Sequence, residues 1–332
     1  MLVIDKAILH VLDLSSGQTA YSDSEMEIKD SIATFLEKHI EKSWSNQSSK
    51  PGRFYDDSEL AGQVRSYASG EMDFVALSQA IARKIEAVLT HADELVSADV
   101  IVADVRIDDQ RQLVIFKCNS HMGFTHQVYQ TDDGVQTDIV NHYSIMPGLT
   151  QRMDEWAFIN LADMQLIVAA KKYSIDGNSI FALPEMVLEA DLRPSPQEAM
   201  KKLSQTAAKV ADDYGRDKVA VEQAVKNYVT ESMQADDELD VAAAAPKIFA
   251  DDPGMQQQFR EEVQEAGFTE PVRMDQEATL KKVCKHKLKT DTGIELSIPT
   301  DYFDNTEYVE FYTNDDGTLS ITLKHIASII NK

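Results

Sequence analysis

The sequence predicts an α+β fold, with N-terminal helices packed on a mainly antiparallel sheet, a helical middle region and a small C-terminal β region. Three helical patterns follow a single first strand and precede a series of strands joined by short turns. This grouping favours an α+β domain over a parallel βαβ fold. The chain has 332 residues, more than one compact core usually holds. We therefore expect three regions, residues 1–184, 185–278 and 279–332.

The first hundred residues predict one strand and three helices. The apolar start of the chain is typical of a strand. Ser22 and Glu25 have the spacing of a capping box, and apolar residues follow at helical spacing: Ile28, Ile32, Phe35, Leu36 and Ile40. Residues 45–52, SNQSSKPG, predict a loop. A second helix is expected from Ser58 to Gly70, and a third carries an apolar stripe of Phe74, Leu77, Ile81, Ile85 and Val88.

Hairpins dominate the rest of the first region. Four strands are expected, at residues 100–107, 112–119, 124–130 and 135–145. The second pair is joined through Asp133-Gly134, and Asp-Gly between β-prone runs is a good hairpin signal. One or two further strands are expected within residues 156–173.

Residues 183–267 predict helices. Ser195, Pro196 and Glu198 combine an N-cap serine, a first-turn proline and a capping-box glutamate, so a helix is expected from there to Gly215. Its inward residues are Met200, Leu203, Ala207, Val210 and Tyr214, and those of the next helix are Val221, Val225, Tyr228 and Val229. The last fifty residues return to strands, expected at 293–299, 307–312 and 318–326.

The chain is strongly acidic, and the acidity is uneven. The formal net charge is -24, of which residues 1–184 contribute -12, residues 185–278 contribute -11, and residues 279–332 contribute only -1. A negative field of this size repels polyanions and keeps a protein soluble. Contact with nucleic acid therefore has to be local or has to pass through another protein.

The composition also indicates in which cellular compartment the protein lies. No apolar run approaches the roughly 20 residues that span a bilayer, so we expect no membrane partner. The N-terminus lacks the basic start and the small-residue cleavage site of a signal peptide. Cys118 and Cys284 are the two cysteines, which is typical of reduced thiols in a cytoplasmic protein.

A zinc site is one candidate for chemistry. Cys118, His121 and His126, with His142 as a further ligand, are residue types that hold zinc. The ligands of a structural zinc site usually lie closer together in the sequence and in pairs. The spacing here therefore favours the interpretation that these are unrelated polar residues at the end of a strand and in the following loop. We expect no bound metal and no cofactor.

Enzymatic motifs are absent from the sequence, which contains no GxxxxGK, GxGxxG, HExxH or GxSxG. A metal-dependent nuclease needs an acidic-x-Lys pair on a strand. Glu27-Ile28-Lys29 has this spelling within an expected helix, and Lys117 has Ile115 where the acid should stand. We expect a protein that is not an enzyme and keep the nuclease as a lesser alternative.

Positive charge is concentrated in KKVCKHKLK, residues 281–289. Read as a strand, this segment places four lysines on one face and one on the other. Such a row could neutralise several phosphates of duplex DNA. Two other interpretations stay open: lysines that protect an exposed edge strand from aggregation, and lysines that pair with the chain's own carboxylates. The candidate DNA-contact residues are Lys281, Lys282, Lys285, Lys287 and Lys289.

The front of the chain resembles a known family. Residues 58–82, SELAGQVRSYASGEMDFVALSQAIA, preceded by AILHVLD at 7–13, resemble the bacterial nucleoid-associated protein family, the NdpA-like group. The shared pattern is Ser58-Glu59-Leu60-Ala61, Arg65, Gly70-Glu71, Asp73-Phe74 and Ser78. The resemblance implies a cytoplasmic bacterial protein found with the nucleoid, bound to DNA or to a DNA-bound partner. It implies no established enzymatic activity and no catalytic residues.

Two functional hypotheses follow. The preferred one is a non-enzymatic nucleoid-associated protein that binds DNA weakly and without sequence specificity, or that associates with DNA through a DNA-bound protein. The alternative is an acidic interaction module that docks on a basic DNA-processing protein, such as a topoisomerase or a histone-like protein. The sequence makes no prediction of the oligomeric state.

Overall fold

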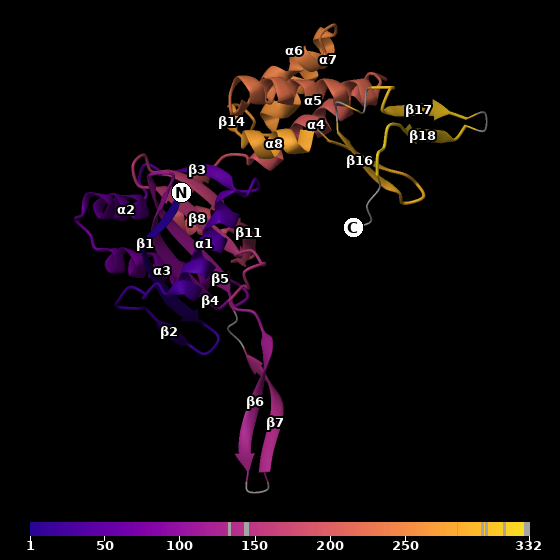
Figure 1. The fold of residues 1–332 in the computed structure, drawn as a ribbon. Helices are drawn as coiled ribbons and strands as arrows, with labels where there is room; N and C mark the ends of the chain where they lie inside the picture. Colours follow the sequence, from indigo (N-terminus) through magenta and orange to yellow (C-terminus); the bar gives the residue numbers. More distant parts are fainter. Residues whose placement is uncertain are drawn as a thin grey trace. The chain divides into compact units, whose positions relative to one another are not determined.

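The computed structural model confirms the α+β class (Figure 1). Its chain divides into two compact units, Met1–Ser195 and Pro196–Lys332. The predicted boundaries at 184/185 and 278/279 stay predictions. The structure describes residues 1–131, 134–142, 146–283, 285–299, 302, 305–314 and 317–328.

An eight-stranded antiparallel sheet forms the centre of the first unit, in the order β12-β3-β9-β8-β5-β4-β1-β2. Asp108 and Asp109, with φ values of 48° and 63°, make the two-residue turn between β4 and β5, which suits the right-handed twist of a hairpin. The strands are β1 (Leu2–Asp13), β2 (Gln18–Ala20), β3 (Lys50–Phe54), β4 (Ala98–Ile107), β5 (Gln110–Asn119), β8 (Glu155–Asn160), β9 (Gln165–Ala169) and β12 (Ala190–Leu192).

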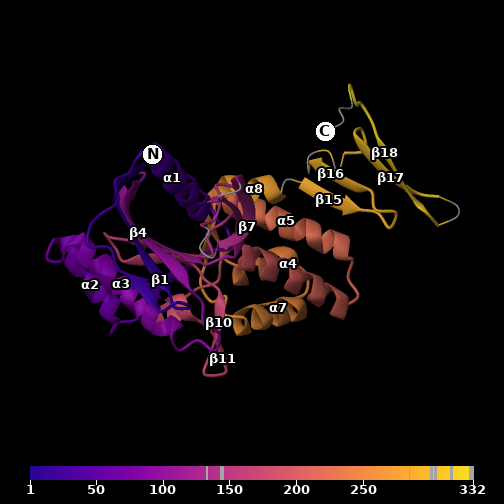
Figure 2. The same ribbon diagram turned by 90° about the horizontal axis from the view of Figure 1, so that it is seen from below.

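Helices cover both faces of this sheet (Figure 2). Because successive strand residues point to opposite faces, Val100 and Val102 join one core whereas Ile101 and Ala103 join the other. The first core lies under α2, α3 and the π-helix η1, and the second lies under α1. The helices are α1 (Asp30–Trp44), α2 (Glu59–Ser69), α3 (Phe74–Leu89) and η1 (Leu183–Leu188).

The predicted second and third helices are confirmed, with side-chain caps at their N-termini. The Ser58 hydroxyl accepts the Ala61 N–H at 3.1 Å, and the Asp73 carboxylate accepts the Ala76 N–H at 2.9 Å. Each cap satisfies a backbone donor that the helix itself cannot pair. Gly70 ends α2 with a φ of 83°, a conformation that costs glycine little.

The capping box predicted at Ser22 and Glu25 is wrong, since α1 begins only at Asp30. Ser22 instead contacts strand β1. Its hydroxyl donates to the Leu9 carbonyl at 2.5 Å, and its backbone N–H donates to Nδ1 of His10 at 3.1 Å. Contacts with the sheet therefore override the local helix-start signal.

The loop predicted at residues 45–52 is also partly wrong, because its end forms β3 between β9 and β12. Pro51 has no N–H to donate, but its carbonyl accepts the Arg193 N–H at 2.8 Å. A Cβ on Gly52 would lie 2.5 Å from the Leu192 side chain and 2.9 Å from the Asp191 carbonyl oxygen. Glycine here permits the close approach of two strands rather than a turn.

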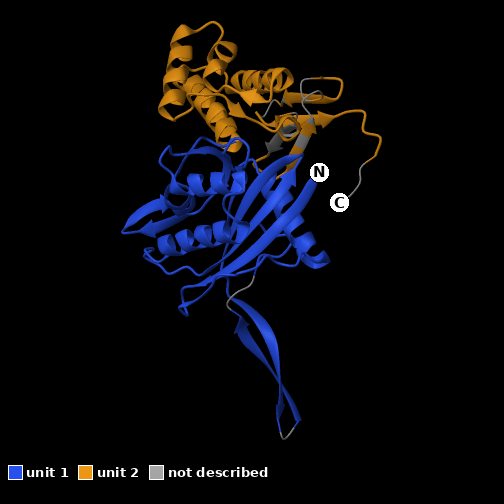
Figure 3. Ribbon diagram, turned by 90° about the vertical axis from the view of Figure 1, so that its left-hand side faces the viewer, with its two compact units in different colours: residues 1–195 blue, residues 196–332 orange. Residues whose placement is uncertain are grey.

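The second unit contains a helical core and two terminal hairpins (Figure 3). The predicted inward faces are confirmed for Leu203, Ala207, Val210 and the four residues of the next helix, but Tyr214 is 46% exposed because α4 ends before it. The helices are α4 (Pro196–Asp213), α5 (Lys218–Ala235), the 3₁₀-helix η2 (Ala242–Ala244), α6 (Ala245–Ile248), α7 (Pro253–Glu265) and α8 (Gln276–Val283).

Short two-stranded ribbons make up the remaining β-structure, and the predicted hairpin at residues 124–145 is confirmed as far as His142. Residues 143–145 of that prediction lie outside the described residues. The ribbons are β6–β7 (Gly123–Thr131, Gly134–His142), β10–β11 (Lys172–Ile175, Asn178–Phe181), β13–β14 (Glu238–Leu239, Val272–Arg273), β15–β16 (Lys285–Lys289, Glu295–Pro299) and β17–β18 (Val309–Thr313, Leu319–Leu323). None of the helices in the described part is long and apolar enough to cross a bilayer.

A buried histidine makes the stability of the first unit depend on pH. Because Nδ1 of His10 accepts the Ser22 N–H, its Nε2 carries the proton and donates to the Ser78 hydroxyl at 3.1 Å. Burial, and secondarily the charge of Arg83, lowers the pKa of His10 to about 4. The unfolded chain, with a histidine pKa of about 6.5, binds more protons between these two values.

The free energy of unfolding should therefore be highest above pH ~6.5 and should fall as the pH drops toward ~4, by up to about 1.4 kcal/mol per pH unit. Urea denaturation at a series of pH values measures this slope. His10→Gln should make the slope shallower, and the control His91→Gln, at an exposed position, should not. Equal slopes for His10→Gln and the unmodified chain would contradict the assignment.

Candidate nucleic-acid interface

The lysine-rich segment spans the end of a helix and a strand. Lys281 and Lys282 lie in α8, and the segment from Lys285 to Lys289 forms β15, which pairs antiparallel with β16. The prediction of one continuous strand across 281–289 is therefore wrong for its first three residues. Lys281 is not part of a strand row with Lys285, Lys287 and Lys289.

Packing explains why the helix continues into the lysines. Asp275 caps α8, its carboxylate accepting the Ala278 N–H at 2.8 Å. Thr279 and Val283, one helical turn apart, are both buried, and Val283 joins the core of the second unit. Burial of this stripe holds the intervening residues in helical conformation.

Strand β15 keeps three lysines at alternate positions, Lys285, Lys287 and Lys289, opposite Pro299, Ser297 and Glu295 of β16. The side chains of all five candidate lysines lie outside the described residues. Their contact with DNA stays a prediction. The register places Lys289 opposite a glutamate, so pairing with the chain's own carboxylates stays open for this lysine.

Elsewhere in the described ranges, many cationic side chains form ion pairs with the chain's own carboxylates. The exposed pairs among them contribute little to stability, and every pair places a negative charge beside a positive one. A phosphate backbone would have to compete with these carboxylates. The pairs include Lys6–Glu25, Lys84–Glu189, Arg106–Asp5, Arg111–Asp104, Lys209–Glu262, Lys218–Asp212 and Lys247–Glu231.

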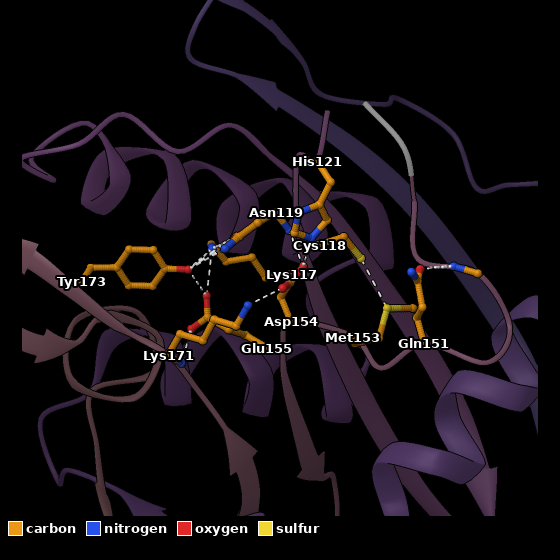
Figure 4. A network of polar contacts seen from close by, with 11 residues as sticks. Lys117, Cys118, Asn119, His121, Gln151, Met153, Asp154, Glu155, Lys171 and Tyr173 are labelled. Atoms are coloured by element: carbon orange, nitrogen blue, oxygen red, sulfur yellow. Dashed lines mark hydrogen bonds and ion pairs between the residues drawn. The ribbon is translucent and has the colours of Figure 1, made fainter. Parts of the chain in front are cut away.

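A buried polar network joins β5, β8 and β10 (Figure 4). Nζ of Lys117 lies 2.8 Å from Oε2 of Glu155 and 2.6 Å from the Tyr173 hydroxyl oxygen. The same ammonium donates to Oδ1 of Asn119 at 2.5 Å, so its three protons all have acceptors. The Tyr173 hydroxyl in turn donates to Glu155 at 2.5 Å.

The network is shut off from solvent. The Lys117 and Glu155 side chains are 3% and 0% exposed. Burial lowers the pKa of Lys117, which the charge of Glu155 opposes, and burial together with Glu155 raises the pKa of Tyr173. The cavity beside these three groups measures about 10 Å³, about the space of one water molecule. The network can hold strands together but cannot admit a substrate.

The sequence did not predict this network, and Lys117 was a candidate only as a nuclease lysine that lacks its acid at Ile115. The available signal was a lysine within the apolar run LVIFKC, together with Glu155 directly before another apolar run, WAFI. A charge within a buried strand requires a partner, but the sequence does not say which one.

The structure does not bring the possible zinc ligands together. Cys118 is 2% exposed, and its thiol faces the Met153 sulfur at 3.4 Å. Burial raises the pKa of the Cys118 thiol to about 12, whereas zinc binds the thiolate. His121 lies 3.4 Å from Asp154, and His126 lies on β6 opposite Ile139. Among the described residues, no three His, Cys, Asp or Glu side chains form a group that could hold a metal ion.

The described features define an acidic α+β protein with one lysine-rich segment and a central sheet covered by helices on both faces. A family model described as "Nucleoid-associated protein YejK" matches residues 8–330. The chain belongs to this family, which confirms the resemblance at residues 58–82. No curated protein matches the chain in sequence.

Replacing Lys117 by methionine should destabilise the first unit by about 3–5 kcal/mol, because it leaves Glu155 buried without its cation. The double variant Lys117→Met/Glu155→Leu should be more stable than this single variant, since it removes both charges. The free energy of unfolding from urea titrations measures both effects.

Lys171→Met is the matched control for Lys117→Met. Lys171 pairs with Asp154 in the same region, but its side chain is 51% exposed, so its loss should cost less than about 1 kcal/mol. An equally small effect of Lys117→Met would show that the buried pair does not hold the strands together.

Proposed function

We propose that this nucleoid-associated protein is a non-enzymatic protein that binds duplex DNA weakly and without sequence preference through the lysines of α8 and β15. The observation that carries the proposal is the placement of five lysines within residues 281–289, in a chain that belongs to a nucleoid-associated family. Contacts with the phosphate backbone give affinity without sequence information.

The distribution of charge supports this site over others. Residues 279–332 contribute only -1 to a net charge of -24, so repulsion of DNA is weakest in this region. Cations elsewhere, such as Lys84 and Lys209, lie 2.6 Å and 2.8 Å from carboxylate oxygens. A local cluster in an acidic chain should give an affinity that falls steeply with salt.

The absence of an enzymatic role is part of the same proposal. The buried titratable groups Lys117, Glu155 and Tyr173 border a cavity of only about 10 Å³. The described side chains that gather there are therefore inaccessible to a nucleic-acid substrate. Incubation of the purified protein with duplex DNA and magnesium or manganese should leave the DNA intact, and cleavage would reinstate the nuclease.

The net charge of -24 also fits a second function, association with DNA through a basic DNA-bound protein such as a topoisomerase or a histone-like protein. Acidic and basic surfaces attract over a distance and set which partners meet. A pull-down after exhaustive nuclease treatment separates the two functions. Partners that persist without nucleic acid favour this second function, and partners that vanish favour direct binding.

The triple variant Lys285→Gln/Lys287→Gln/Lys289→Gln tests the direct site. Its affinity for duplex DNA should fall, and the slope of log affinity against log salt should shrink by about 2.7, from three contacts at about 0.9 each. Its thermal stability should change little, because the proposal places these charges at the surface, where each contributes within about 0.5 kcal/mol. Fluorescence anisotropy at several salt concentrations measures affinity and slope.

A control with the same loss of charge is Lys29→Gln/Lys38→Gln/Lys247→Gln, at positions that are 68%, 61% and 62% exposed. It should keep most of the affinity. Equal weakening by both triple variants would point to general electrostatics rather than a site. Unchanged affinity with self-association of the first variant would favour protection of an edge strand.

A further inference from the structure

The ribbon formed by β6 and β7 carries an apolar face that no described element covers. The two strands pair with each other over nine residue pairs, from Gly123–His142 to Thr131–Gly134, and with no other strand that the structure describes. Figure 1 shows the ribbon clear of the eight-stranded sheet. Along both strands every described residue except Gly123 and Val140 is exposed.

The register places four large apolar side chains of the ribbon on one face. Phe124 and Val128 of β6 lie on the same face as Val135 and Ile139 of β7, since the pairs 124–141, 126–139, 128–137 and 130–135 share it. Diagonal neighbours join these four residues into one stripe. They are 69%, 59%, 66% and 74% exposed, in the order Phe124, Val128, Val135 and Ile139. The same face also carries His126, Gln130, Thr137 and Asn141, each directly opposite one of the four apolar residues. The opposite face carries Thr125, Gln127, Gln136 and Asp138, together with Tyr129 and Val140.

Such a ribbon needs a partner. An isolated two-stranded hairpin is marginally stable in water, and it gains stability when its apolar face packs on another surface. Isolated exposed apolar residues are ordinary on protein surfaces, whereas a continuous stripe marks an interaction site.

Charge indicates what the partner is. Residues 123–142 contain no lysine or arginine and three aspartates, so the ribbon lacks the side chains that usually neutralise a phosphate backbone. The apolar face itself holds no acidic residue, because Asp138 lies on the other face. A basic partner protein would have no carboxylate to bind there.

A second copy of the chain fits this face. Two copies with a net charge of -24 each repel one another, and they can meet most easily where neither presents a charge. Strands of nine residues extend about 30 Å, which is long enough for one ribbon to pack along another. A two-fold contact also matches each surface to itself.

We propose that the β6–β7 ribbon is a dimerisation arm, whose stripe of Phe124, Val128, Val135 and Ile139 packs on the same stripe of a second copy. Face-to-face packing of two ribbons at about 10 Å removes the stripes of both copies from water. The proposal depends on no DNA contact and stands apart from the lysine site.

Sedimentation velocity of the full chain across a wide concentration range tests the proposal. The expected species has about twice the 37.1 kDa mass of one chain. Val128→Thr/Ile139→Thr keeps β-branched residues in the strands but makes the stripe polar, and it should weaken dimerisation at least about tenfold. At concentrations low enough for both chains to be monomeric, the melting temperature should stay unchanged, because the ribbon contributes no residue to the cores of the first unit.

Tyr129→Thr/Val140→Thr is the matched control, because it removes apolar groups from the opposite face of the same ribbon. It should leave the dimer intact. Added salt should strengthen the dimer or leave it unchanged, since salt screens repulsion between acidic copies and does not weaken apolar contact. A monomer at every concentration, equal weakening by both double variants, or dissociation by salt would each overturn the proposal.

Discussion

The two-sided burial of β4 and β5 requires the chain to supply cover for both faces of its central sheet. Val100 and Val102 need one layer, and Ile101 and Ala103 need the other. Helix α1 covers one face, while α2, α3 and η1 cover the other. Because η1 and β12 follow the rest of the sheet in sequence, the first compact unit extends to Ser195.

The buried polar network of Lys117, Glu155 and Tyr173 lies among the apolar residues of the first unit, and its role follows from the strands that it connects. Lys117 and Glu155 stand on adjacent strands, whereas Tyr173 stands on β10, whose strand partner is β11. The network therefore ties the β10–β11 hairpin to the main sheet without a backbone ladder. A fully satisfied polar cluster of this kind specifies one arrangement of its strands, and its closure separates it from any surface function.

Charge is distributed unevenly over the chain, so different surfaces suit different kinds of partner. Most of the chain is acidic, and many of its described cations already face carboxylates. The segment 281–289 concentrates positive charge, and the ribbon 123–142 has no lysine or arginine and carries a stripe of four apolar residues on one face. The proposed phosphate binding uses the first and the proposed contact between copies uses the second, so the two proposals are independent.

The sequence by itself determined the elements whose signals are local. The helix that begins after Ser58 and ends at Gly70, the apolar stripe of α3 and the Asp-Gly hairpin depend on signals within a few residues. Tertiary contacts, and not the local sequence, determine that Pro51 and Gly52 lie in a sheet strand and that α8 extends into the lysine-rich segment. Tertiary contacts also determine that Lys117 pairs with Glu155, which is 38 residues away. These choices depend on which surfaces meet, and burial against distant residues outweighs the small free energies of local preference.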